Sequence, residues 1–229
     1  MLRTFIVTIL AALSTTFVGD RSKAEAPTVH ATASGAESGS IKGKIKTAVK
    51  LKLKGPVSQK HVVVYVDECK EIPAKAGAAS AVVKQEKLNF DPHVVAVSKG
   101  TTIEFTNADT VVHNVFSQEE CCKIDKDTKQ GESLKQVFDK VGVVPVVCRL
   151  HPEMSLFVVV TPNPKFAVVE IKKDKAEDGD AAVEVDFEIA DVPPGEYTLK
   201  TWHKKLKETT VKVKVEAGKV ATVEITLEK

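Results

Sequence analysis

Hydrophobic and polar residues alternate along most of the chain after residue 40. A period of two places apolar side chains on one face of a β-strand and polar side chains on the other. The pattern predicts strands at residues 41–53, 61–67, 94–97, 101–106, 111–116, 135–138, 143–148, 156–161, 166–171, 182–189, 197–202, 209–215 and 220–227. We interpret residues 68–84 as a loop. Short strands at this spacing indicate an all-β fold of the sandwich type.

The first 40 residues do not share this alternation. A charged start precedes an apolar run at residues 4–18, which is typical of a secretory signal. We therefore expect a signal peptide at residues 1–26 and export of the mature protein. Residues 27–40 are rich in Ala, Ser and Gly and should form a flexible leader. No later run is long enough to span a bilayer, so we expect no membrane span once the signal is removed.

The charged residues do not indicate an additional class of partner. Thirty-three Lys and Arg residues against 31 Asp and Glu residues leave a formal charge of +2. They are interleaved along the predicted strands, as on the solvent faces of half-buried sheets. Because no basic patch stands out, we expect no nucleic-acid partner.

Candidate metal ligands gather at the end of the predicted strand at residues 143–148. Cys148, His151 and Met154 follow one another at three-residue spacing. A copper centre that cycles between Cu(I) and Cu(II) needs a thiolate, two imidazoles and a weak axial thioether. His113, flanked by apolar residues on another strand, supplies the second imidazole, and Met154 is the one methionine besides the initiator. The sequence therefore predicts one copper ion bound by His113, Cys148, His151 and Met154.

Zinc and hydrolytic chemistry are the competing interpretations of these residues. Cys121, Cys122, Cys148 and His151 formally make a Cys3His zinc set. Adjacent cysteines do not readily direct both sulfur atoms to one tetrahedral ion, and an exported chain favours disulfides over zinc thiolates. A Cys–His hydrolase would need a third, orienting group that the motif lacks.

The ligand motif resembles the cupredoxin family, in particular its amicyanin-like branch, whose ligand loop has the same Cys-x-x-His-x-x-Met spacing. His113-Asn114 looks like the family's His-Asn signature, although Leu150 stands where many relatives have proline. The resemblance implies a Greek-key sandwich at residues 82–161 that holds type 1 copper. It also implies that Asn114 braces the ligand loop and helps to place a backbone N–H toward the Cys148 sulfur, and that electrons leave through the edge of His151.

A second resemblance covers the C-terminal part of the chain. Residues 191–199, with the turn at Pro193-Pro194-Gly195, look like carboxypeptidase-regulatory-like β-sandwiches of the transthyretin type. Cupredoxins joined to such a domain resemble bacterial exported proteins labelled methylamine-utilisation or plastocyanin-like. The resemblance implies a periplasmic electron carrier without catalytic turnover, whose redox partner is a dehydrogenase or a cytochrome.

Two arrangements of the units are open. In the first, residues 41–69 and 165–229 together form the transthyretin-like sandwich, and the cupredoxin is inserted between them. In the second, residues 41–67 are the first strands of the cupredoxin itself. The strand pairing of residues 62–66 distinguishes the two arrangements.

Two functions other than electron transfer are also compatible with the sequence. A copper-handling protein, or a carbohydrate-binding or adhesive module with Trp202 and His203 on its surface, is an alternative to electron transfer.

Copper would use one of the four cysteines and leave an odd number of cysteines for disulfide bonds. Since a bridge between adjacent cysteines strains the peptide between them, we expect a disulfide from Cys69 to Cys121 or Cys122.

Overall fold

The computed structural model describes residues 37–47, 60–72, 80–171 and 184–229. These residues belong to one unit, Ala36–Lys229. The expected signal peptide and all but the last four residues of the expected leader lie outside them. No helix among the described residues is long and apolar enough to cross a membrane.

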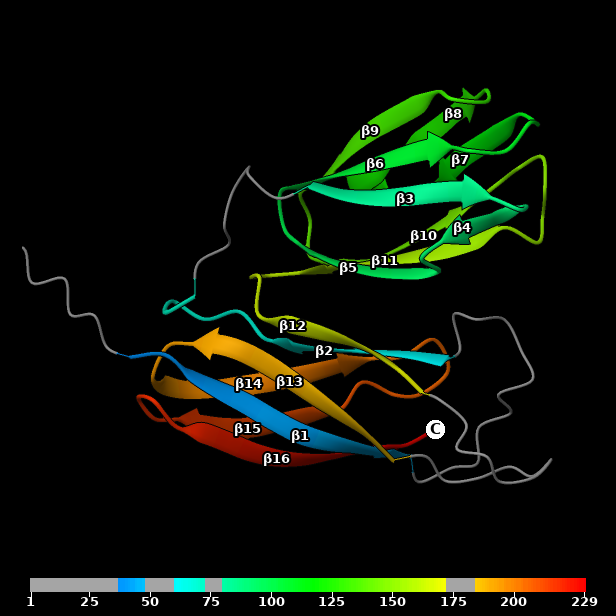
Figure 1. The fold of residues 1–229 in the computed structure, drawn as a ribbon. Coiled ribbons are helices and arrows are strands. Elements are labelled where there is room, and N and C mark those ends of the chain that lie inside the picture. Colours follow the sequence, from blue (N-terminus) through cyan, green and yellow to red (C-terminus); the bar gives the residue numbers. More distant parts are fainter. Residues whose placement is uncertain (1–36, 48–59, 73–79, 172–183) are drawn as a thin grey trace, which may run out of the picture. The chain divides into compact units, whose positions relative to one another are not determined.

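Two sheets form what we call the central sandwich (Figure 1). One has the strand order β5-β11-β10-β7-β8 and the other the order β4-β3-β6-β9. The strands are β3 (Ser80–Glu86), β4 (Asn89–Asp91), β5 (Val94–Ser98), β6 (Thr101–Asn107), β7 (His113–Ser117), β8 (Ile124–Thr128), β9 (Ser133–Phe138), β10 (Gly142–Val147) and β11 (Ser155–Thr161), with the 3-10 turn η2 (Glu120–Cys122) between β7 and β8. Their inward apolar side chains, among them Phe90, Phe105 and Phe138, form one buried core.

Two further sheets form what we call the flanking sandwich. Their strand orders are β13-β1-β16 and β12-β2-β14-β15. The strands are β1 (Gly39–Thr47), β2 (His61–Val66), β12 (Phe166–Glu170), β13 (Glu184–Val192), β14 (Gly195–Trp202), β15 (Thr210–Val215) and β16 (Val220–Leu227). The protein is therefore all-β, as the alternation predicts.

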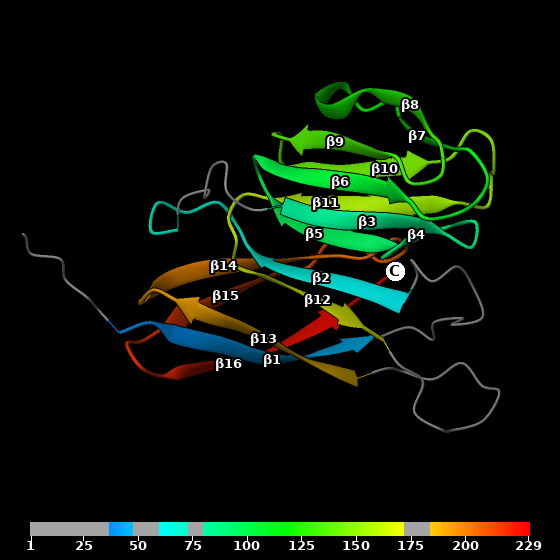
Figure 2. The same cartoon turned by 45° about the horizontal axis from the view of Figure 1, so that its top comes forward.

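The strands that precede the central sandwich in sequence pair with strands that follow it. β2 pairs antiparallel with β12 and with β14. β1 lies between β13, antiparallel, and β16, parallel, and its blue ribbon between two strands from the C-terminal part is visible in Figures 1 and 2. Among the described residues, neither strand joins a sheet of the central sandwich. This is the pairing that the inserted arrangement requires.

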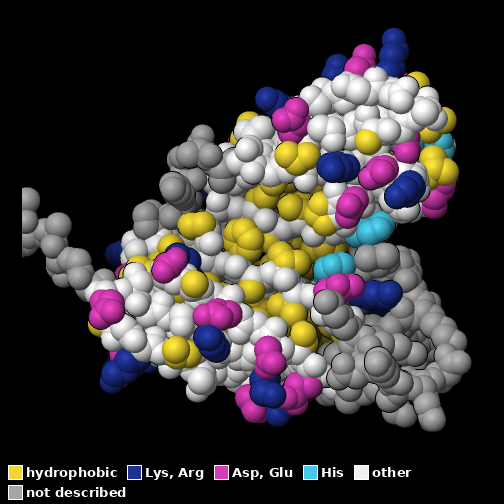
Figure 3. All heavy atoms as spheres, viewed as in Figure 1, with side chains coloured by type: hydrophobic (Ala, Val, Ile, Leu, Met, Phe, Trp, Pro, Cys, Tyr) yellow, Lys and Arg dark blue, Asp and Glu magenta, His cyan; other side chains and the backbone are white. Residues whose placement is uncertain are grey.

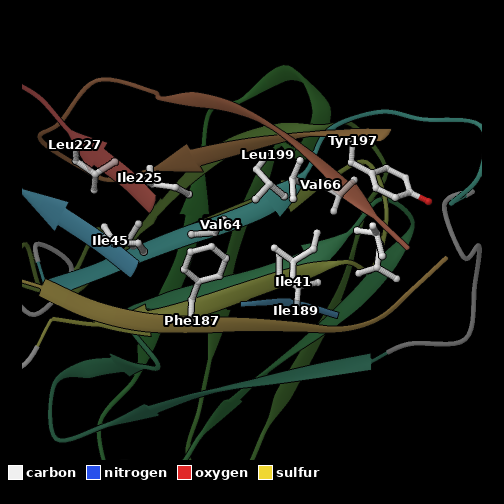
Figure 4. Close-up of a cluster of buried hydrophobic side chains, with 14 of the residues drawn as sticks. Ile41, Ile45, Val64, Val66, Phe187, Ile189, Tyr197, Leu199, Ile225 and Leu227 are labelled. Carbon is white, nitrogen blue, oxygen red and sulfur yellow. The ribbon is translucent and has the colours of Figure 1, made fainter. Parts of the chain in front are cut away.

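The core of the flanking sandwich is built from both ends of the chain. Figure 4 shows Ile41 and Ile45 of β1 in one cluster with side chains of β2, β13 and β16. Gly43 lies between them, opposite Phe187 and Val223. A Cβ atom on Gly43 would lie 2.4 Å from the Val223 carbonyl oxygen and 2.5 Å from the Phe187 ring. Only glycine therefore leaves space for the Phe187 ring against β1.

The outer face of the three-stranded sheet carries paired charges. Lys42 pairs with Glu188, Lys44 with Glu184, and Lys46 with Glu224. Figure 3 shows basic and acidic side chains interleaved over the face in view. These exposed pairs contribute little to stability, about 0–1 kcal/mol each, but they keep the outer faces of the strands in water.

A buried asparagine closes the junction where the chain leaves and re-enters the flanking sandwich. The Asn163 side chain has no exposed surface, and its Nδ2 donates to the carbonyl oxygens of Val66 at 3.0 Å and Asp67 at 3.1 Å. Buried polar groups require such partners. Asn163 thus joins the start and the end of the intervening segment.

Three strands depart from the sequence expectation. β3 occupies part of the predicted loop at residues 68–84, and β4 and β8 were not predicted. β8 has only its first and last residues buried, Ile124 and Thr128, so it lacks the apolar alternation of an inner strand. β3 buries Gln85 as well as Val83 and exposes Val82, so its apolar residues do not all lie on the buried face.

Candidate metal centre

The four predicted ligands lie at one end of the central sandwich. His113 is the first residue of β7, and Cys148 directly follows β10. The loop from Cys148 to Met154 then leads into β11, which pairs with β10 throughout its length. His113 and Met154 have no exposed surface, and Cys148 is 2% exposed. Strand ends thus hold the thiol and one imidazole, while a short loop brings the others to them.

Three donor atoms converge. The Nδ1 atoms of His113 and His151 lie 3.1 Å apart, and the Cys148 sulfur lies 3.6 Å from His151 Nδ1. All three donor atoms lie within 4.8 Å of one another. Within the part of the chain that the structure describes, this is the one group of three or more potential His, Cys, Asp or Glu metal ligands. It combines a soft thiolate with two imidazoles, the donor types that suit copper.

Met154 is placed by hydrogen bonds within the loop. The Cys148 N–H donates to the Met154 carbonyl oxygen at 3.2 Å, and the Met154 N–H donates to the His151 carbonyl oxygen at 3.0 Å. Met154 also belongs to the same buried apolar cluster as Cys148. The loop therefore has a closed backbone conformation, with the methionine turned into the protein.

Asn114 contacts the cysteine sulfur through its backbone. Its N–H donates to Cys148 Sγ at 3.3 Å, as the resemblance implied. Its side-chain Nδ2 donates to Asp127 at 2.8 Å and to Asp125 at 3.1 Å, both on β8. An N–H donor to a ligating sulfur tunes the redox potential of a metal centre.

A carboxylate that the sequence analysis did not single out holds His113. Asp109 Oδ2 lies 2.7 Å from His113 Nε2. Burial alone would raise the pKa of the Asp109 carboxyl, but hydrogen bonds from the Leu88 N–H, the His113 ring and the Lys87 N–H together lower it. A carboxylate at Nε2 fixes the tautomer that leaves Nδ1 free for a metal ion. An acidic residue four positions before the histidine was the available sequence signal.

The ligand loop is connected to β8 through Arg149. Arg149 donates to Asp125 at 2.6 Å, and its guanidinium lies 5.0 Å from the centre of the Phe116 ring. Asp125 also accepts the bond from Asn114. Asp125 thus connects Arg149, which follows Cys148, to Asn114, which follows His113.

Apolar side chains next to the ligands are exposed. Leu150, between the cysteine and the second histidine, is 52% exposed, and Val111 and Val112, before the first histidine, are 44% and 40% exposed. His151 is partly exposed, whereas His113 is completely buried. We call Val111, Val112 and Leu150 the apolar rim.

The expected disulfide is absent. All four cysteines are free thiols. Cys69 packs against the core of the flanking sandwich, whereas Cys121 and Cys122 pack in the central core. They belong to different cores, so the bridge from Cys69 was wrong. Cys121 and Cys122 also do not join the metal cluster, because η2 follows the end of β7 opposite His113.

Trp202, the aromatic residue considered for sugar binding, packs against another side chain of the protein. Trp202 packs on Phe157 of β11, with ring centres 5.4 Å apart, and Lys204 lies 4.8 Å above the Phe157 ring. His203 is 4% exposed. Trp202 of β14 therefore packs against a strand of another sheet.

Comparisons with known proteins concern the central sandwich. Residues 77–161 match the model of the copper binding proteins of the plastocyanin/azurin family. No curated protein matches the chain. Among solved structures, a purple cupredoxin from Nitrosopumilus maritimus is 24% identical, with 35% of this chain and 99% of that chain covered and a TM-score of 0.32. Amicyanin from Paracoccus versutus is 21% identical, with 42% and 96% covered and a TM-score of 0.34.

A copper-containing nitrite reductase from Thermus scotoductus is also similar. It is 25% identical, with 38% of this chain and 25% of that chain covered and a TM-score of 0.32. The family match spans less than half of this chain and leaves the flanking sandwich unassigned. Together with the converging His113, Cys148 and His151, it supports a copper-binding cupredoxin unit at residues 77–161.

Proposed function

We propose that this chain is a type 1 copper protein that passes single electrons between redox partners. The proposed ligands are His113 Nδ1, Cys148 Sγ, His151 Nδ1 and, as a weak axial donor, Met154. The observation that carries the proposal is the convergence of one sulfur and two Nδ1 atoms within 4.8 Å at a nearly buried site. A copper ion held by these donors supplies a one-electron Cu(I)/Cu(II) couple.

The surrounding residues suit such a couple because they hold the donors in place. Asp109 orients the His113 ring, and the Asn114 N–H donates to the Cys148 sulfur. The backbone bonds between Cys148, His151 and Met154 fix the loop that carries the other donors. A preformed set of ligands needs little rearrangement when its charge changes by one, which favours rapid electron exchange.

His151 is the proposed exit for the electron. Its ring contacts that of His113, with centres 4.9 Å apart, and it is the more exposed of the two. The apolar rim gives a partner protein a surface that is easily freed of water. We propose a dehydrogenase or a cytochrome as partner. Four protein donors leave no open ligand position, so we propose a carrier without catalytic turnover.

The location and the domain boundaries belong to the same proposal. We propose that residues 1–26 direct export to the periplasm and that the copper unit, residues 82–161, is inserted into a carboxypeptidase-regulatory-like sandwich of residues 41–69 and 165–229. The pairing of β2 with β12 and β14 supports the insertion. The Tyr197 hydroxyl, which donates to the Pro193 carbonyl oxygen at 2.8 Å, supports the proposed turn.

One titration tests the function. Adding Cu(II) to the purified protein should give an intense visible thiolate-to-copper band and a narrow copper hyperfine splitting at one copper per chain. The band should bleach with one electron and return on oxidation without loss of metal. Rapid transfer of the ion to an acceptor chelator, with no reversible bleaching, would instead favour copper handling. Binding of sugars independent of copper would favour the carbohydrate module.

A further inference from the structure

Two adjacent thiols lie outside the proposed copper site. Cys121 and Cys122 end the 3-10 turn η2, where the Cys122 N–H donates to the Glu119 carbonyl oxygen at 2.9 Å. Their sulfur atoms are 3.0 Å apart. Cys121 is partly exposed, whereas Cys122 is 2% exposed. The pair lies on the connection between β7, which carries His113, and β8, which holds the Asn114 side chain.

The spacing of the two sulfur atoms argues against a shared metal ion. Sulfur atoms 3.0 Å apart, each about 2.3 Å from one ion, would subtend an angle of about 80° at that ion. Tetrahedral and trigonal thiolate sites need wider angles. A disulfide bond requires the opposite movement, because its sulfur atoms must approach to about 2.05 Å. The turn already holds the two sulfur atoms close together. The strain that a bridge between adjacent cysteines places on the peptide between them makes such a bond easily reduced, which suits a reversible pair rather than a structural one.

We propose that Cys121 and Cys122 form a reversible dithiol/disulfide pair, a two-electron redox site separate from copper. Its reaction partner is a disulfide-bearing oxidant, either a small molecule or a protein. The Cys121 thiolate attacks one sulfur of that disulfide and expels a thiolate. Cys122, after losing its proton, then attacks the Cys121 sulfur and expels the second thiolate. Two protein thiols are thereby oxidised while one external disulfide is reduced to two thiols.

The unequal environments of the two sulfurs assign these roles. Burial, the hydrogen bond with Cys121 and the nearby charges of Cys121, Asp139 and Glu119 raise the pKa of the Cys122 thiol. Cys122 therefore does not begin the exchange, since the attacking species is a thiolate that can be reached. Cys121 is the accessible member. An exposed attacking thiol beside a resolving cysteine is the arrangement of redox-active cysteines.

The surface on either side of the turn is open, although neither cysteine lines the groove there. Residues just before and after η2 line an open groove of about 500 Å³, formed by Phe116, Ser117, Gln118, Lys123, Ile124 and Asp125. Cys69, the remaining thiol, packs against the flanking core and is not a competitor for either sulfur. The adjacent pair therefore accounts for two of the three cysteines that copper does not use.

Mass spectrometry of the full-length metal-free protein tests this inference. The protein is incubated with oxidised glutathione and a chelator, so that copper ions do not oxidise the thiols, and is then mapped without reduction. We expect the peptide containing both cysteines to lose two hydrogens in wild type and in the control Cys69→Ser. Cys122→Ser should stop at one glutathione on Cys121. Cys121→Ser should react at least tenfold more slowly. A dithiol reductant should restore both thiols.

Several results would overturn the inference. In the wild-type protein, these are that Cys121 and Cys122 both stay free thiols at excess oxidant, that the glutathione adduct accumulates, or that either cysteine forms a bridge to Cys69. Equal reaction rates of Cys121→Ser and Cys122→Ser with oxidised glutathione would also contradict it. Because Cys148 is mapped on a different peptide and copper is absent, these outcomes do not depend on whether the protein carries electrons through copper.

Discussion

Asp109, which is partly exposed, and the buried His113 form a carboxylate–imidazole pair, with 2.7 Å between Oδ2 and Nε2, on the side of the ring opposite the proposed metal ligand atom. Removing the carboxylate frees the ring to rotate or to change tautomer. We expect Asp109→Ala to weaken copper binding by about 10- to 100-fold, measured by competition with a chelator. The exposed Asp186→Ala is the control and should leave the affinity unchanged. Equal affinities for both variants would show that the pair does not position His113.

The thiolate of Cys148 is required for the visible colour. We expect Cys148→Ser to abolish the intense band, because a hydroxyl cannot supply the thiolate-to-copper charge transfer. The control Cys69→Ser, in the other core, should keep it. Absorption spectra of both variants after copper addition make the comparison, and a blue Cys148→Ser protein would contradict the proposed ligand set.

Met154 should affect the potential more than the colour. Met154→Leu replaces a fully buried thioether by a side chain of similar volume, so we expect a loss of stability under about 1.5 kcal/mol. Removing a donor that favours Cu(II) should raise the reduction potential while the visible band persists. Voltammetry of both proteins is the measurement. An unchanged potential would mean that the thioether is not an axial ligand.

The strand β1 should stabilise the flanking sandwich although it precedes the central one in sequence. Ile41 is completely buried in the flanking core, so Ile41→Ala should cost about 2–5 kcal/mol in the free energy of unfolding. Lys42→Ala, on the exposed face of the same strand, should change it by about 0.5 kcal/mol or less. Denaturant unfolding followed by fluorescence of the single tryptophan, Trp202, reports the difference. Similar values for the two variants would count against this role of β1.

Gly43 should not tolerate a methyl group. The contacts of 2.4 Å and 2.5 Å that a Cβ would make involve a backbone oxygen and a packed ring, neither of which moves freely. We expect Gly43→Ala to lower the free energy of unfolding by about 1–3 kcal/mol, as overpacking does. Gly131→Ala is an unsuitable control because Gly131 has a positive φ, so Lys42→Ala, at an exposed position of β1, is used instead. A Gly43→Ala protein as stable as the control would mean that β1 can shift away from Phe187.

Three of the four proposed copper ligands could be predicted from the sequence because they lie in one short segment. Cys148, His151 and Met154 lie within seven consecutive residues, so a single loop places them close together in space. The alternation of apolar and polar residues likewise predicted most strands, since burial on one face of a sheet is a local property of the sequence. It missed β8, an edge strand with only two buried residues.

Only the tertiary structure decided which distant residues meet. Alternation predicts that a strand exists but does not identify its neighbour, so the position of β1 between β13 and β16 depends on packing across some 140 to 180 residues of chain. Asp109 and His113 are only four residues apart, but the sequence does not show that the chain between them turns so that the carboxylate contacts the ring. The cysteines show it most clearly. Counting suggested a bridge from Cys69, whereas folding places Cys69 in one core and the sulfur atoms of Cys121 and Cys122 together in another.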